Sequence, residues 1–231
     1  MSAAAITCIL PAYNEAPRIA AVLDAVAGHD LIGEVIVVDD GSSDGTAAIA
    51  ESYAAQHDNV SLIVQPQNGG KTRAVVTGIE AAGGSHLMLI DTDLVGLGPE
   101  HLSALIAPVS DGRAHASISL RRNSPWPWRA LGIDYISGER VMPRAVLADQ
   151  LDALLALPRF GLEVFMNDLW LEAGFDIAVV RWPEVDSPLK SAKHGKLAGI
   201  AADVKMMRDI FRTIPAHHTL RQIFTMRARR I

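Results

Sequence analysis

The sequence predicts an α/β fold in which a mostly parallel central sheet carries helices on both faces. Three observations predict it: short aliphatic runs at regular intervals, helical periodicity between them, and an ordinary globular composition. The 231 residues are 49% hydrophobic and 20% charged, which excludes a disordered or fibrous chain. This length suits one large domain with a sizeable core, and we expect residues 1–231 to form it.

Four short apolar segments in the first half predict buried strands, at residues 5–10, 34–38, 60–64 and 86–90. Between them, apolar residues recur at helical spacing in residues 17–27, 46–55 and 71–82. Pro17 suits the first turn of a helix, because its missing N–H would have no partner there. Strands that alternate with helices in this way join into a parallel sheet.

The second half is less regular. We expect strands at residues 113–120 and 176–180, and loops at residues 124–128 and 187–195. Apolar periodicity predicts helices at residues 144–156, 162–173, 199–214 and 218–229.

Composition excludes several functional classes. The chain has 21 Lys and Arg and 26 Asp and Glu, so its net charge of −5 argues against nucleic-acid binding. The single cysteine, Cys8, excludes an internal disulfide and a cysteine-based metal cluster. A membrane-spanning helix needs about 18–20 apolar residues, and no run approaches that length. The N-terminus also lacks the pattern of a signal peptide, so we expect a cytoplasmic protein.

A polar loop follows each of the four strands predicted in the first half. Because the carboxyl ends of parallel strands meet at one edge, where such sheets bind ligands, we expect the loops to converge. Each loop alone has an ordinary reading as a turn or a helix cap, but four at one edge indicate a site. Their charged side chains are Glu15, Asp39, Asp40, Lys71, Asp91 and Asp93.

This acidic cluster points to a divalent cation. Neighbouring carboxylates repel one another and are tolerated best beside a positive charge. Asp91 and Asp93 offer the hard oxygen ligands that Mg²⁺ or Mn²⁺ prefers, and such ions usually also contact substrate phosphates. The sequence has neither a P-loop nor a Gly-x-Gly-x-x-Gly turn, which argues against an NTPase or a dinucleotide enzyme.

Four segments together resemble family 2 glycosyltransferases with the GT-A fold: PAYNE at 11–15, VIVVDDGSSDGT at 35–46, NGGK at 68–71 and DTD at 91–93. The later half, with SGER at 137–140, FGLE at 160–163 and His194, is similar to glucosyl-3-phosphoglycerate synthases and, less closely, to polyprenyl-phosphate sugar transferases. The resemblance implies a nucleotide-binding half at 1–95, an acceptor-binding half at 96–215 and a basic C-terminal helix at 216–231.

The resemblance implies a metal-dependent hexosyltransferase that takes a sugar from a UDP- or GDP-linked donor, with Mg²⁺ or Mn²⁺ as cofactor. Asp40, or Asp39 as the near alternative, would bind the base. The residues implied in donor binding are Pro11, Ala12, Tyr13, Glu15, Asp39, Asp40, Lys71, Asp91 and Thr92. The implied metal ligands are Asp91, Asp93 and His194. A histidine in a lysine-rich loop is equally often a plain surface residue.

Glu163 and Asp168 are the candidates for a catalytic base, and the stereochemical outcome stays open. The implied acceptor is a small phosphorylated molecule, a glycan or a lipid phosphate. Candidate phosphate contacts are Arg121, Arg122, Arg140 and Lys196, each of which also suits a solvated surface. Trp126 and Trp128 suit sugar stacking or packing equally well.

Alternatives remain at this stage. The basic tail at 208–230 has three interpretations. It suits peripheral contact with the anionic inner surface of a membrane, packing as a helix against the domain, or contact between the two copies of a homodimer. The rival functions are a sugar-phosphate nucleotidyltransferase and a non-catalytic nucleotide-sugar binding module. The former normally has a glycine-rich loop where this chain has PAYNE, and the intact DTD segment argues against the latter.

Overall fold

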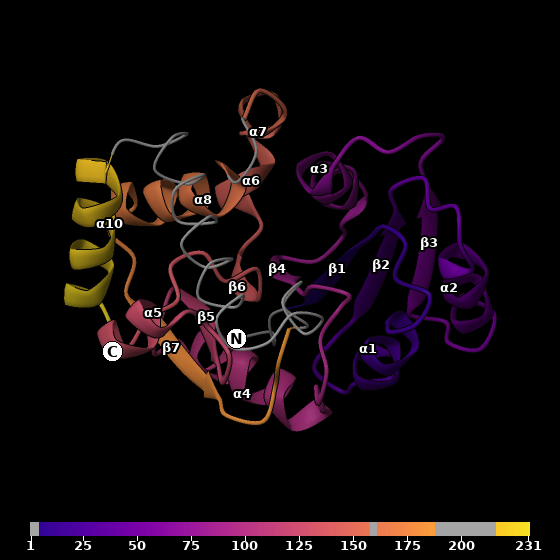
Figure 1. The fold of residues 1–231 in the computed structure, drawn as a ribbon, viewed down its shortest axis with the longest axis horizontal. Helices are drawn as coiled ribbons and strands as arrows, with labels where there is room; N and C mark the ends of the chain where they lie inside the picture. The colour runs from indigo at the N-terminus through magenta and orange to yellow at the C-terminus, as the bar shows by residue number, and fades with distance from the viewer. Residues whose placement is uncertain (1–4, 158–160, 188–215) are drawn as a thin grey trace, which may run out of the picture.

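A seven-stranded sheet forms the centre of the computed structural model, which describes residues 5–157, 161–187 and 216–231 (Figure 1). The strand order is β3-β2-β1-β4-β6-β5-β7. The strands are β1 (Ile6–Ala12), β2 (Glu34–Asp39), β3 (Val60–Val64), β4 (His86–Leu89), β5 (Ala116–Arg121), β6 (Arg140–Pro143) and β7 (Ile177–Trp182).

The sheet is mostly parallel, as the sequence predicts. β1 pairs in parallel with β2 and β4, β2 with β3, and β5 with β7. Only β6 runs against its neighbours β4 and β5. The carboxyl ends of all strands except β6 therefore lie at one edge, and the loops that follow them surround the same place.

Helices cover both faces of the sheet, which confirms the second part of the prediction. α1 (Ile19–Val26), α2 (Thr46–Ala54) and α4 (Pro99–Ser110) bury their apolar residues in one core. The other core takes the remaining helices: α3 (Lys71–Ala81), α5 (Trp126–Leu131), α6 (Ala145–Ala148), α7 (Leu151–Leu155), α8 (Gly161–Glu172) and α10 (Ala216–Ala228). Ile9 enters one core and Cys8 the other, because successive side chains of a strand point to opposite faces.

The structure differs from the sequence predictions in four elements. β6 and α4 were not anticipated by the sequence pattern. The loop expected at residues 124–128 is wrong from Trp126 onward, where α5 begins with Pro127 in its first turn, a position that proline tolerates. The single helix expected at 144–156 is divided into α6 and α7 at Asp149 and Gln150. The helix expected at 199–214 lies outside the described residues.

Among the described residues, no helix combines the length and the apolar character needed to cross a bilayer.

Candidate active site

Hydrogen bonds that involve side chains join the loops after β1 and β2. The N–H of Asn14 donates to Ser42 Oγ at 2.9 Å, and Asn14 Oδ1 accepts from the N–H of Ser43 at 2.9 Å. The N–H of Glu15 donates to Thr46 Oγ1 at 2.8 Å. Asn14 has a φ of 55°, a left-handed conformation that asparagine adopts more readily than most residues. The two loops therefore form one wall of the site.

The adjacent aspartates at the end of β2 have different partners. Both oxygens of Asp40 accept backbone N–H groups of the next loop, from Gly69 at 2.8 Å and Gly70 at 2.7 Å. Asp39 Oδ2 accepts from the N–H of Ser42 at 3.1 Å, whereas the buried Asp39 Oδ1 has no hydrogen-bond partner among the described residues. Asp40 thus holds the loop before α3, and Asp39 presents an unused acceptor.

Hydrogen bonds to the backbone carbonyls of Pro11 and Ala12 join the loops of neighbouring strands. Thr92 Oγ1 donates to the carbonyl of Pro11 at 3.1 Å, which joins the loops after β1 and β4. The carbonyl of Ala12 accepts the N–H of Asp40 at 2.8 Å. Tyr13 is exposed beside them. The structure therefore brings the residues that the sequence assigns to the donor site into adjoining loops.

Lys71, the first residue of α3, bridges two carboxylates from distant parts of the chain. Its Nζ lies 2.7 Å from Asp91 Oδ1 and 3.1 Å from Glu163 Oε1. Burial lowers the pKa of Lys71, but Asp91 and Glu163 outweigh burial and hold the pKa above its ordinary value. Burial raises the pKa of Asp91, and Lys71 in turn holds it below its ordinary value. A side chain at Gly138 would place its Cβ 2.6 Å from Asp91 Oδ2 and 2.8 Å from Lys71 Nζ, so it would displace this ion pair.

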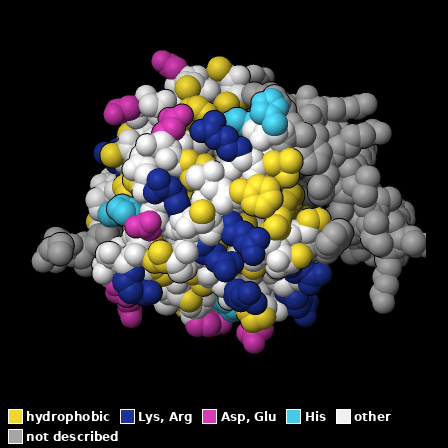
Figure 2. Space-filling view, turned by 90° about the vertical axis from the view of Figure 1, so that its left-hand side faces the viewer, with side chains coloured by type: hydrophobic (Ala, Val, Ile, Leu, Met, Phe, Trp, Pro, Cys, Tyr) yellow, Lys and Arg dark blue, Asp and Glu magenta, His cyan; other side chains and the backbone are white. Residues whose placement is uncertain are grey.

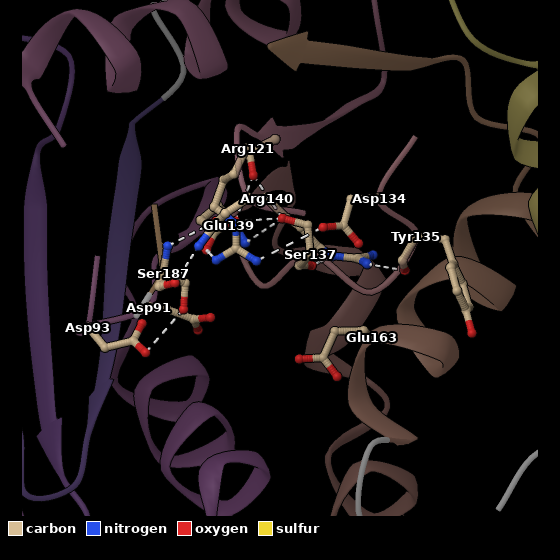
Figure 3. A network of polar contacts seen from close by, with 12 residues as sticks. Asp91, Asp93, Arg121, Asp134, Tyr135, Ser137, Glu139, Arg140, Glu163 and Ser187 are labelled. Carbon is tan, nitrogen blue, oxygen red and sulfur yellow. Dashed lines mark hydrogen bonds and ion pairs between the residues drawn. The ribbon is translucent and has the colours of Figure 1, made fainter. Parts of the chain in front are cut away.

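Asp93 lies in an acidic environment. Its Oδ2 accepts a hydrogen bond from Ser187 Oγ at 3.2 Å (Figure 3). Burial, with further contributions from Asp91 and Glu15, raises the pKa of Asp93 to about 6. Three carboxylates from the loops after β1 and β4 therefore act on one another, as the sequence predicts, and a bound cation would relieve their repulsion.

A buried carboxylate that sequence reasoning missed lies behind this cluster. Glu139 is fully buried and accepts hydrogen bonds from Ser119 Oγ at 2.6 Å, Ser137 Oγ at 2.5 Å and Arg121 Nη1 at 2.9 Å (Figure 3). Arg121 is close enough to lower the pKa values of Asp91 and Asp93. The SGER segment was the available signal, but nothing in this segment indicates that its glutamate pairs with Arg121.

Arg140 is a structural residue, which corrects its assignment as a candidate phosphate contact. The guanidinium is fully buried and donates to the carbonyls of Ser137 at 2.7 Å and Tyr135 at 2.8 Å, and to Asn167 Oδ1 at 2.5 Å. It lies 4.9 Å from the centre of the Trp170 ring. Burial lowers the pKa of Arg140 to about 10. Arg140 therefore fixes the turn that carries Gly138.

The two candidates for a catalytic base on α8 face different surroundings. Glu163 points to Lys71. Asp168 accepts from Gln222 Nε2 at 2.9 Å and lies 3.3 Å from His218 Nε2, so it faces α10. The structure therefore brings Glu163 into the acidic cluster and leaves Asp168 at a helix–helix contact.

The remaining candidates have varied positions. Arg122 is exposed and pairs with Asp186. Trp128 is buried, with its ring centre 4.7 Å from that of Tyr135, so it serves packing. His194 and Lys196 lie outside the described residues.

The fold and the acidic loops at its carboxyl edge define a GT-A type nucleotide-diphospho-sugar transferase fold, as the sequence resemblance implies. The model of the family "Glycosyl transferase family 2" matches residues 7–151, which is more than half of the chain. The chain belongs to this family.

Solved structures of low sequence identity share the fold. Glucosyl-3-phosphoglycerate synthase from Mycobacterium tuberculosis, in complex with Mn²⁺, uridine diphosphate and glucosyl-3-phosphoglycerate, has a TM-score of 0.69 and 22% identity. The match covers 91% of this chain and 80% of that one. The same enzyme with phosphoglyceric acid has a TM-score of 0.67 and 24% identity, over 82% of this chain and 74% of that one.

Curated relatives match over a shorter region. A dolichyl-phosphate beta-glucosyltransferase, ALG5C of Trichomonas vaginalis, is 38% identical over 96 residues, which is 38% of this chain and 28% of the relative. Glycosyltransferase AglE of Haloferax volcanii is 37% identical over 91 residues, which is 38% of this chain and 30% of the relative. The match thus spans less than a third of the length of either relative.

Proposed function

We propose that the protein is a metal-dependent hexosyltransferase that transfers a sugar from a nucleotide-sugar donor. The observation that carries the proposal is the gathering of the half-buried carboxylates Asp91 and Asp93 with Glu15 at the carboxyl edge of the sheet. Burial and the neighbouring carboxylates raise the pKa of Asp93 to about 6, which supports the proposal. Such a cluster suits a divalent ion that also binds a diphosphate. Residues 1–95 would bind the donor and residues 96–215 the acceptor, in one domain.

Asp39 is a better candidate than Asp40 for binding the nucleotide base. Its buried Oδ1 has no partner among the described residues, whereas both Asp40 oxygens are occupied by the N–H groups of Gly69 and Gly70. A buried acceptor without a partner is costly, and the ring N–H of a uracil would satisfy it. Uridine diphosphate in the M. tuberculosis complex supports a UDP-linked donor.

The carboxylates of Asp91 and Asp93 suit Mn²⁺ or Mg²⁺ as ligands, because both side chains offer hard oxygen atoms. The described residues contain no group of three His, Cys, Asp or Glu side chains placed to hold a metal, so further ligands would come from the diphosphate and from His194, which lies outside them. The ion would act as a Lewis acid that neutralises charge on the leaving diphosphate. Mn²⁺ accompanies UDP in the M. tuberculosis complex, which supports this assignment.

Lys71 and Glu163 would act on the sugar side of the site. Lys71 holds Asp91 and Glu163 in place and adds positive charge beside the diphosphate. Glu163 is the candidate that would accept the proton of the acceptor hydroxyl or orient the acceptor, because Asp168 faces α10.

A basic cavity supports a phosphorylated acceptor. It has a volume of about 190 Å³ and lies at the carboxyl ends of β5 and β7, along the same sheet edge as Asp93. Arginine presents a planar fork that matches phosphate. The charged residues that line the cavity are Arg121, Arg122, Arg129 and Arg181.

Calorimetry with UDP, with and without Mn²⁺, tests the proposal. We expect Mn²⁺ to strengthen UDP binding, Asp93→Ala to abolish the effect of Mn²⁺, and Asp39→Ala to weaken binding at every Mn²⁺ concentration. Asp30→Asn is the matched control, because Asp30 is exposed in the loop between α1 and β2, away from this edge. Binding of UDP that ignores Mn²⁺ would contradict the metal assignment. Release of pyrophosphate from UTP, in place of UDP from a UDP-sugar, would favour a nucleotidyltransferase.

A further inference from the structure

The outward side of α10 combines apolar side chains with arginines. Leu220 is 51% exposed and Phe224 is 58% exposed, and their i, i+4 spacing places them on one side of the helix. Ile231, just beyond the helix, is also 58% exposed. Arg221 and Arg227 are exposed beside them. Exposed apolar and basic side chains therefore share one helical face.

The opposite side of α10 fixes this orientation. Ile223 and Met226 are buried in the core that α10 shares with α8. Gln222 Nε2 donates to Asp168 Oδ1 and to the carbonyl of Val164, both at 2.9 Å. The helix is therefore anchored by its inner side. Leu220 and Phe224 lie on its outer side, which the core does not need.

More arginines adjoin α10. Arg230 Nη1 donates to the carbonyl of Gly132 at 2.9 Å, which joins the C-terminus to the end of α5. Arg129 of α5 and Arg181 of β7 are exposed and line the basic cavity described above. Figure 2 shows this side of the molecule, where Lys and Arg side chains gather around hydrophobic ones and acidic side chains lie mostly toward the periphery. We call this surface, formed by α10, α5 and the end of β7, the arginine face.

The arginine face is positive although the chain carries a net charge of −5. Within the described ranges, no carboxylate oxygen lies within 4.0 Å of the side-chain nitrogens of Arg129, Arg181, Arg221 or Arg227. Arg122, at the rim of the cavity, is paired with Asp186. These arginines therefore give the face a local positive charge that attracts anions.

The combination of apolar and basic side chains selects among anionic partners. A nucleic acid would use the arginines but leave Leu220, Phe224 and Ile231 exposed to water. A second copy of this chain would cover the apolar residues but bring two positive faces together. A bilayer with anionic headgroups satisfies both, because headgroups attract arginines and apolar side chains enter the headgroup–acyl boundary.

We propose that the arginine face docks on the surface of an anionic lipid bilayer. The side chains of Leu220 and Phe224 enter the boundary region, while Arg221 and Arg227 contact headgroup phosphates. The arginine face shares Arg129 and Arg181 with the cavity proposed for the acceptor. The residues that make the membrane contact, Leu220, Phe224, Arg221 and Arg227, are not among those that line this cavity, so the proposal does not depend on sugar transfer.

Sedimentation of the full chain with vesicles tests the proposal. We expect binding to vesicles that contain phosphatidylglycerol, little binding to vesicles of phosphatidylcholine alone, and weaker binding at high salt. The double variant Arg221→Glu/Arg227→Glu should bind the anionic vesicles at least about tenfold more weakly. The double variant Leu220→Ser/Phe224→Ser should also bind more weakly, since it removes the apolar contact but retains the arginines.

Matched variants from other parts of the surface serve as controls. Arg113→Glu reverses an exposed arginine after α4, and Leu31→Ser replaces a leucine that is 46% exposed in the loop between α1 and β2. Both should bind vesicles as the unmodified protein does. Equal binding to both kinds of vesicle, no binding to either, or unchanged binding by either double variant would overturn the proposal. So would gel filtration in which Leu220→Ser/Phe224→Ser turns a dimer into a monomer, because the face would then join two copies.

Discussion

Replacing Asp93 with Asn should stabilise the metal-free protein. Burial, Asp91 and Glu15 raise the pKa of Asp93 from 3.8 to about 6, and one pKa unit corresponds to about 1.4 kcal/mol. Ionised Asp93 would therefore cost up to about 3 kcal/mol of unfolding free energy. We expect a gain of about 1–2 kcal/mol for Asp93→Asn, because the side chain is only partly buried and solvent screens part of the repulsion.

The stability gained by Asp93→Asn should depend on pH. A carboxyl group whose pKa is raised on folding stabilises the protein below the unfolded pKa, and this contribution is lost as the pH rises through about 6. The advantage of Asp93→Asn should thus be full at about pH 8, roughly half at about pH 5, and absent in stronger acid.

Urea unfolding in EDTA at several pH values measures this advantage. Mn²⁺ should then stabilise the unmodified protein but not the variant, since only a ligand that binds the native state shifts unfolding. Asp30→Asn, at an exposed position, is the control and should change little. A variant less stable than the parent at about pH 8 in EDTA, or a difference that ignores pH, would refute the reasoning.

Four further substitutions test other parts of the site. Gly138→Ala places a Cβ 2.6 Å from Asp91 Oδ2 and should lower kcat by about tenfold or more in a donor-turnover assay; an unchanged kcat would contradict the close approach. Glu163→Gln should lower kcat by about 10²-fold and Asp168→Asn by less than about twofold, and steady-state kinetics with the opposite ranking would assign the base to Asp168. Arg140→Lys cannot reproduce three buried guanidinium hydrogen bonds and should lower the free energy of unfolding in urea by about 2–4 kcal/mol. An unchanged free energy of unfolding would show that the turn at 135–138 does not depend on Arg140.

The first half of the fold could be predicted because its central strands are buried on both faces. Such strands consist of continuous aliphatic runs, which are the strongest signal that a single sequence offers. β6 gave no such signal, because it has four residues, begins with Arg140 and ends with Pro143. α4 was obscured by Pro99 at its start and Pro108 within it. In each case, packing against the sheet outweighed a local preference.

The site could be predicted at the level of loops but not of atoms. Parallel topology brings Glu15, Asp39 and Asp93 to one edge, and turn residues mark each loop. The sequence does not show which of two adjacent aspartates keeps a free oxygen, because that depends on the backbone N–H groups of another loop. It also does not show that Lys71 and Glu163, which are 92 residues apart, form an ion pair.

The pairing of charges in the site explains why metal binding should depend most on Asp93. Lys71 neutralises Asp91, and Arg121 neutralises Glu139. Within the part of the chain that the structure describes, no cationic side chain lies within 4.0 Å of the Asp93 carboxylate. A fold that only needed to accommodate these carboxylates would gain by pairing or neutralising this one, since an uncompensated charge that is even partly buried is costly. The cost at Asp93 is therefore best understood as the condition for binding an external divalent ion, which supports the proposed metal-dependent transfer.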